Sequence, residues 1–169
     1  DDNGTNTLTN TLAKGASTYR YVYLRYDPTT SGWPNLGELI VMSNGVNIAA
    51  GKIATTNLSQ YSVGEGLANL TDGNLSNPWT SLSSSVSSGW LQLDLGAAYH
   101  IDSTAIAGAP YGNARAQGFT TWLSNSNLSG TTLANLPAAG AVQIQTTTPA
   151  FSSSDPLQIG RLVSTDDTT

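Results

Sequence analysis

The sequence of 169 residues contains no cysteine, which excludes disulfide bonds and thiolate metal ligands. Basic residues are also scarce, since 6 Lys and Arg stand against 11 Asp and Glu and give a formal net charge of -5. A chain without a basic patch has nothing to meet phosphates, so we expect no nucleic-acid partner. No apolar run approaches the roughly 20 residues that a membrane-spanning helix needs, so no membrane span is expected.

The usual machinery of nucleophilic catalysis is missing as well. His100 is the single histidine, and no G-x-S-x-G motif accompanies it. Asp94 and Asp102 lie on either side of His100, but two aspartates in strands or turns are common and make a weak acid–base pair. We therefore expect a protein that is not an enzyme.

The residues that are abundant point to a β-protein. Charged residues make up 10% of the chain, whereas Ser, Thr, Asn and Gly are plentiful, a composition typical of secreted or assembled β-proteins. No stretch of ten or more residues has a helical period with caps. Strands alternating with turn residues indicate one all-β sandwich domain. The expected strands span residues 19–26, 36–42, 91–95, 101–107, 119–124, 141–145 and 157–163.

Alternation with a period of two also predicts the core. The apolar positions of the expected strands should face inward, because successive side chains of a strand point to opposite faces. Trp79, Trp90 and Trp122 are expected to pack in the core or at its edge. The strand residues predicted to be buried are Val22, Leu24, Leu39, Val41, Leu91, Leu93, Leu95, Ile101 and Ile106.

One stretch, residues 68–96, combines an oxygen-rich turn with a strand. Gly73 and Asn74 tolerate a positive φ and so allow a sharp turn after Asp72. The strand that follows alternates Leu with Gln92 and Asp94 and is expected to end at Gly96. The turn oxygens suit a hard cation such as Ca²⁺, which takes six to eight oxygen ligands. The alternative is a purely structural turn, in which Asp72 caps its own backbone.

These motifs, taken in order, carry a resemblance to a known family. The D-G-N turn at residues 72–74 is followed by Trp79, by W-L-Q-L-D-L-G at residues 90–96 and by Y-H-I-D at residues 99–102. This order resembles the discoidin or F5/8 type C family, including its fucolectin-like branch, over residues 19–126. The resemblance implies a discoidin-like (galactose-binding-like) jelly-roll β-sandwich.

The resemblance also implies the residues of a calcium site and of a ligand site. In the fucolectin-like branch a cation is held by turn oxygens, by a hydroxyl further on and by a glutamate of the closing strand. Arg115 matches the arginine of an R-x-x-G motif that contacts sugar, and Tyr111 and Trp33 are expected to add aromatic faces. An exposed loop charge is the alternative for Arg115. The expected calcium ligands are Asn69, Asp72, Asn74, Ser83 and Glu38.

The sequence departs from the family pattern in two respects. Val86 and Gly108 fall near the places of a histidine and a second arginine of the fucose motif, which puts fucose specificity in doubt. The strands at residues 19–42 resemble strands that usually close such a domain, yet here they come first. Either the domain is circularly permuted, the reading we favour because sandwich termini often lie close together, or these strands belong to a preceding domain that is truncated here.

Together these features predict a polar arm or linker over residues 1–18 and a single domain over residues 19–169. We expect a non-catalytic extracellular module that recognises glycans or glycoproteins on a surface and has a calcium-stabilised loop. The alternative is a structural subunit of a virion, fibre or surface layer, in which neighbouring copies are the partners. The expected location is extracellular, on a cell surface or on a virion surface.

Overall fold

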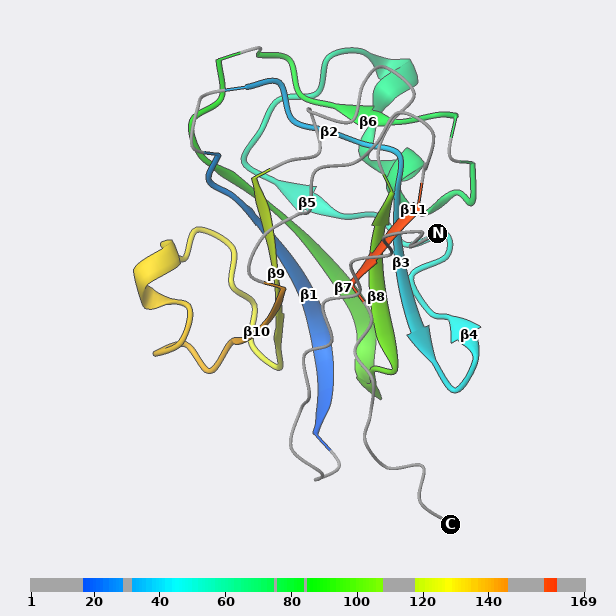
Figure 1. The fold of residues 1–169 in the computed structure, drawn as a ribbon, viewed down its shortest axis with the longest axis vertical. Coiled ribbons are helices and arrows are strands. Elements are labelled where there is room, and N and C mark those ends of the chain that lie inside the picture. Colours follow the sequence, from blue (N-terminus) through cyan, green and yellow to red (C-terminus); the bar gives the residue numbers. More distant parts are fainter. Residues whose placement is uncertain are drawn as a thin grey trace, which may run out of the picture.

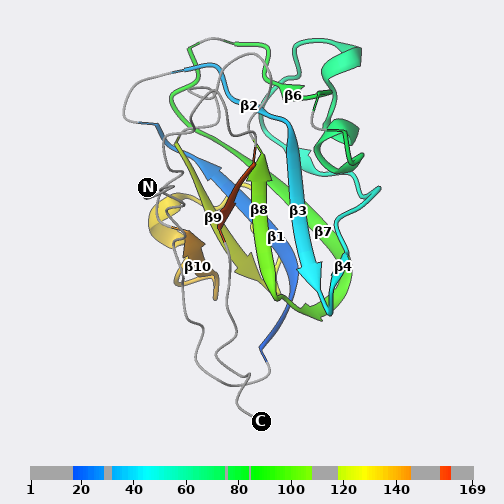
Figure 2. The ribbon, with the colours of Figure 1, turned by 45° about the vertical axis from the view of Figure 1, so that its right-hand side comes forward.

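The structure is a computed structural model that describes residues 17–28, 32–74, 76–83, 85–107, 118–145 and 157–160. Two antiparallel sheets pack face to face, and a short strand pair crosses one end of them (Figures 1 and 2). The larger sheet has the order β10 (Val142–Gln145), β9 (Phe119–Ser124), β1 (Thr18–Tyr26), β7 (Gly89–His100) and β5 (Thr55–Thr56). The second has the order β11 (Leu157–Gly160), β8 (Ser103–Ala107), β3 (Glu38–Ser43) and β4 (Val46–Asn47). The end pair is β2 (Asn35–Leu36) with β6 (Trp79–Thr80).

The part of the chain that the structure describes contains no α-helix, only short 3-10 helices. These are η1 (Val63–Glu65), η2 (Leu67–Thr71) and η4 (Leu133–Asn135). The predicted all-β sandwich is therefore confirmed. No helix among the described residues has the length and apolar character to cross a membrane.

Strand β1 lies in the middle of the larger sheet, although it is the first described strand of the chain. It pairs antiparallel with β7 on one side and with β9 on the other, so that Val22 lies opposite both Leu93 and Leu123. Strand β3 pairs with β8 in the second sheet. The early strands thus contribute to both layers, while the permuted order itself stays a prediction.

The space between the sheets is filled by the residues that the alternation predicted. All nine predicted strand residues are buried, none with more than 2% of its surface exposed. Trp79 is fully buried and joins the same cluster, as expected. Burying such side chains contributes about 1.5–3 kcal/mol each, so this cluster is the main stabilising feature of the fold.

A second apolar cluster covers the outer face of the larger sheet. Tyr23 and Trp122 point to this face, where Leu128 and Leu136 from the loop after β9 pack against them. The side chain of Gln92, expected on a polar face, is buried there instead and accepts the N–H of Leu128 at 2.7 Å. Its amide nitrogen donates to Asn127 and Ser129 at 3.0 and 3.2 Å, so one side chain fastens this loop.

Several expected strand boundaries are wrong, and two of these differences alter the strands most. The expected strand at residues 36–42 is divided at Gly37 into β2 and β3, which pair with β6 and β8 respectively. Gly96 does not end its strand: with φ of 84° it forms an irregularity, and β7 continues to His100. The register of β1 against β7 shifts at this level, between Tyr19 and Tyr21. A glycine with positive φ in a strand marks a bulge as readily as an end.

Other predictions are confirmed or lie outside the described residues. The turn at Asn44 and Gly45 has φ of 49° and 74°, as an Asn-Gly hairpin turn requires, and joins β3 to β4. Residues 1–16 of the expected arm lie outside the described residues. So do Tyr111 and Arg115.

Candidate functional site

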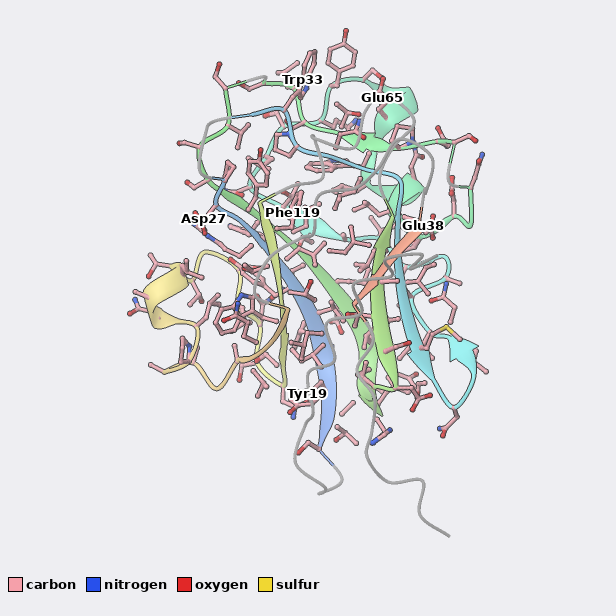
Figure 3. All side chains as sticks on the ribbon, viewed as in Figure 1. Tyr19, Asp27, Trp33, Glu38, Glu65 and Phe119 are labelled. Atoms are coloured by element: carbon pink, nitrogen blue, oxygen red, sulfur yellow. The ribbon has the colours of Figure 1, made fainter. Side chains whose placement is uncertain are left out.

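The carboxylate of Glu38 is buried at the start of β3. Only 1% of the residue is exposed, although a glutamate is seldom buried without a charged partner. Its Oε1 accepts the backbone N–H of Gly73 at 3.3 Å, whereas Oε2 has no hydrogen-bond partner among the described residues. Glu38 therefore reaches the Asp72 turn across 35 residues of sequence. Figure 3 shows its position beside β3, lower on the molecule than Trp33.

Burial changes the acidity of this carboxylate. The pKa of Glu38 is raised from its ordinary value of 4.5 to about 7, above all because burial disfavours the charged form. The hydrogen bond from Gly73 lowers this pKa, and the negative charge of Asp72 raises it. The charge of Asp72 is thus felt at Glu38, and no salt bridge to either carboxylate is found in the described part of the chain.

The turn opposite Glu38 is held by its own polar groups. Asp72 ends η2, and Gly73 has φ of 79°, which a residue with a side chain rarely adopts. Asp72 Oδ1 accepts the N–H of Asn74 at 2.7 Å, and Oδ2 accepts the side-chain N–H of Asn77 at 3.1 Å. These are the contacts that the structural-turn alternative requires. They do not involve the main-chain carbonyl of Asn74, which accepts the N–H of Asn77 at 3.0 Å.

Asn69 connects this turn to the preceding loop. Its side-chain nitrogen donates to the carbonyl of Gly64 at 2.8 Å and to that of Pro78 at 3.1 Å. The amide thus spans from the end of η1 to the start of β6. The role expected for Asn69 at a cation uses its main-chain oxygen, which these bonds do not involve.

Ser83 is the expected ligand with the least support from the geometry. Its hydroxyl accepts the N–H of Ser85 at 3.1 Å, and its carbonyl accepts the hydroxyl of Ser81 at 3.1 Å. Within the described residues no hydrogen bond joins Ser83 to the Asp72 turn. The structure therefore brings Glu38 to Asp72 and leaves Ser83 bonded within its own segment.

The donor set decides which metal these residues suit. No group of three or more His, Cys, Asp or Glu side chains in the described residues is placed to hold a metal ion. A cation here would rest on Glu38 and Asp72 and take its other ligands from carbonyls and hydroxyls. Such an oxygen set fits Ca²⁺ and does not fit a transition metal that prefers imidazole or thiolate.

Trp33, the one expected ligand contact within the described residues, lies at the end of the sandwich crossed by β2 and β6 (Figure 3). Its indole N–H donates to the carbonyl of Ser81, and its ring meets that of Tyr61 edge to face, with centroids 5.4 Å apart. Tyr61 is 49% exposed and was not singled out from the sequence. The only signal was an aromatic residue inside the polar loop S-Q-Y-S at residues 59–62.

Comparison with known proteins identifies the family. The model of the F5/F8 type C family described as "NedA-like, galactose-binding domain" matches residues 69–154, half of the chain. The match includes the Asp72 turn and strands β6 to β10, and it confirms the resemblance seen in the sequence. No curated protein and no solved structure matched. Domains of this family are carbohydrate-binding and generally non-catalytic modules. The chain therefore belongs to the F5/F8 type C family, as a NedA-like, galactose-binding domain.

Proposed function

We propose that this domain is a non-catalytic extracellular module that recognises carbohydrate on a cell surface and has a loop stabilised by calcium. Membership of a galactose-binding family supports the carbohydrate ligand. The observation that supports calcium is the buried Glu38 carboxylate beside the Asp72 turn, one of whose oxygens has no hydrogen-bond partner among the described residues.

Calcium would offset a cost that the fold otherwise bears. Two carboxylates close together in a partly dry site repel each other, and burial of an unpaired charge is unfavourable. A divalent cation removes both penalties and links β3 to the turn. The residues that would hold it are the carboxylates of Glu38 and Asp72, the main-chain oxygens of Asn69 and Asn74, and the hydroxyl of Ser83.

The ligand contacts proposed from the sequence are Arg115, Tyr111 and Trp33. Arg115 supplies planar hydrogen-bond donors for sugar hydroxyls, and an aromatic ring supplies a face for the C–H groups of a pyranose. If Arg115 contacts the glycan, Arg115→Ala should weaken binding by at least about 1.5 kcal/mol, a typical value for a hydrogen bond to a charged group. An unchanged affinity would reject this role.

A second candidate function is a structural subunit of a virion, fibre or surface layer. Val86, near the place of a histidine in the fucose motif, is buried and exchanges two backbone hydrogen bonds with Gly32, at 3.0 and 2.9 Å. An apolar, buried residue at that place offers no hydrogen bond to a sugar. In this reading the partners are neighbouring copies of the chain.

A glycan array with the purified chain, in calcium and then in chelator, separates the two functions. The binding module should label a defined set of glycans in calcium and lose signal in chelator. The structural subunit should label none and should form oligomers in solution, which light scattering measures. Glycan binding that is equal in calcium and in chelator would support a carbohydrate ligand and would contradict a role for calcium in binding.

A further inference from the structure

The turn between β3 and β4 places an asparagine before a glycine at the lower end of the second sheet (Figure 2). Asn44 and Gly45 are both exposed, and their φ angles are 49° and 74°. Within the described residues the side chain of Asn44 makes no hydrogen bond. Nothing lies within 4 Å of the place that a Cβ would take at Gly45. Neither packing nor hydrogen bonding therefore holds the Asn44 side chain, and solvent reaches both residues.

This pair has the groups for an intramolecular reaction. When the Gly45 nitrogen loses its proton to a base in the solvent, it becomes a nucleophile toward the side-chain carbonyl carbon of Asn44. The N–Cγ bond forms, the Cγ–Nδ2 bond breaks, and the amide leaves as ammonia after taking a proton from water. Water then opens the succinimide ring, at Cγ to give aspartate or at the main-chain carbonyl to give isoaspartate. Glycine favours ring closure because it has no side chain to obstruct the approach.

Asp102, in the turn between β7 and β8, contacts the nitrogen that would react. Its Oδ2 accepts the Gly45 N–H at 3.4 Å, and its Oδ1 lies 3.3 Å from Nδ1 of His100. Its own N–H donates to the carbonyl of Met42 at 2.8 Å, which holds the two turns against each other. A carboxylate beside the Gly45 N–H disfavours loss of the proton, because that loss would place a second negative charge next to the first. The hydrogen bond is long, so it slows the reaction without preventing it.

The neighbouring asparagines of the described chain are held in place. Asn47 lies in β4, and its Oδ1 accepts the N–H groups of Val41 and Ala49 at 3.2 and 3.1 Å. The residue after Asn47 is β-branched and hinders ring closure. Asn35 is fully buried. The structure therefore separates Asn44 from the asparagines on either side of it.

We propose that Asn44 is a site of spontaneous deamidation and that Asp102 restrains the reaction by holding the Gly45 N–H. The aspartate product adds one negative charge near Asp102, in a chain whose net charge is already -5. The isoaspartate product adds a methylene to the main chain between Ser43 and Val46, which are paired in the hairpin. Either product loosens β4, the edge strand of the second sheet. This chemical ageing of the folded protein depends on neither a glycan nor calcium.

Incubation of the full chain in mildly alkaline buffer, followed by tryptic mass mapping, tests the site. Trypsin releases residues 26–52 as one peptide, which contains Asn35, Asn44 and Asn47. Fragment masses should show deamidation at Asn44 and none at the other two. Asn3 also precedes a glycine, but it falls in the peptide of residues 1–14 and is measured separately. A peptide 26–52 that stays unmodified, or that is modified equally at Asn44 and Asn47, overturns the site.

Variants of the second turn test the restraint. Asp102→Ala removes the acceptor of the Gly45 N–H and should raise the deamidation rate of Asn44 about threefold, a typical effect of losing one hydrogen bond. His100→Gln is the matched control, because His100 contacts the other carboxylate oxygen, and it should leave the rate unchanged. Thermal unfolding should show that both variants are folded. A rate that is unchanged or lower in Asp102→Ala overturns the restraint.

Discussion

Two carboxylates of this sandwich, Asp94 on β7 and Glu38 on β3, have opposite surroundings. Asp94 is exposed, and Arg20 donates to both of its oxygens at 2.8 Å. The Gly96 N–H adds a third bond at 2.8 Å. Hydrogen bonding from Arg20 holds the pKa of Asp94 below its ordinary value. Glu38 is buried, has one long hydrogen bond, and has a pKa raised to about 7.

Among the described residues, Asp94 has a basic side chain beside it and Glu38 has none. At the surface, water and Arg20 both stabilise a carboxylate, so either one alone would suffice. Glu38 is buried and no basic side chain among the described residues pairs with it, so the group must bind a proton or a cation or destabilise the fold. Asp94 thus forms an ordinary surface ion pair, whereas Glu38 needs a bound proton or cation to be tolerated in the interior.

Removing residues 1–45 should have the largest effect, because it deletes Glu38 and Arg20 together with their strands. Strand β1 pairs with β7 and β9, so its loss divides the larger sheet. We expect no cooperative thermal unfolding transition by circular dichroism. Removal of residues 1–16 alone is the control and should preserve the transition. If the chain without residues 1–45 keeps its stability and its response to chelator, permutation and Glu38 ligation are both wrong.

Calcium should distinguish the two carboxylates directly. Ligand binding to the folded state alone raises the unfolding free energy by about 2.7 kcal/mol at a hundredfold excess over Kd. Chelator should therefore lower the melting temperature of the natural chain, and Glu38→Gln should abolish this response. Asp94→Asn is the control and should retain it. If chelator still lowers the melting temperature of Glu38→Gln, Glu38 is not a calcium ligand.

The pH dependence of metal-free protein should reveal the raised pKa of Glu38. The folded state keeps its proton up to about pH 7, whereas the unfolded chain releases it near 4.5. Stability should therefore fall as the pH rises between these values. One pKa unit is worth about 1.4 kcal/mol, and water at the exposed Asp72 turn screens part of it, so we expect a loss of about 2 kcal/mol.

Denaturant unfolding at a series of pH values in chelator measures this slope. Glu38→Gln cannot titrate, so its stability should vary less over the same range. A natural chain that is equally stable at pH 5 and pH 8 would show that the carboxylate is better solvated than its burial indicates.

Arg20→Ala should have the smallest effect, because the ion pair with Asp94 is exposed and salt screens it. The stability contributed by the Arg20–Asp94 ion pair changes with pH in the direction opposite to that expected for Glu38. Because the pKa of Asp94 is lower in the folded state, the ion pair stabilises the fold at pH values above the unfolded-state pKa of Asp94. This stabilisation is lost as the pH falls. Urea unfolding at low and high salt should show a slight difference between Arg20→Ala and the natural chain at low salt only.

The core was predictable from the sequence because period-2 alternation is a local signal. Leu91, Leu93 and Leu95 all face the sandwich, as their spacing requires. Gln92 follows the same alternation, but its burial depends on the loop after β9 folding back over the sheet, which no local pattern encodes. The division at Gly37 was equally hidden, because pairing with β6 or β8 is decided by tertiary contacts.

The candidate site was predictable only in parts. The Asp72 turn is visible in the sequence, while its contact with Glu38 was expected from the family resemblance rather than from spacing. Tyr61 was missed because a single aromatic residue in a polar loop is not part of any hydrophobic periodicity that the sequence could reveal. Only the register of Gln60 against Ser81 and the contact with Trp33 reveal its surroundings.

The two bonds donated by the Asn69 side chain have a consequence for how this protein can be produced. Asn69 begins an N-L-T sequence, which secretory pathways with N-glycosylation modify at the amide nitrogen. Both hydrogens of that nitrogen are already used, toward Gly64 and Pro78. A glycan would replace one of them and separate the end of η1 from the start of β6. In a glycosylating host, folded chains should therefore be those left unmodified at Asn69.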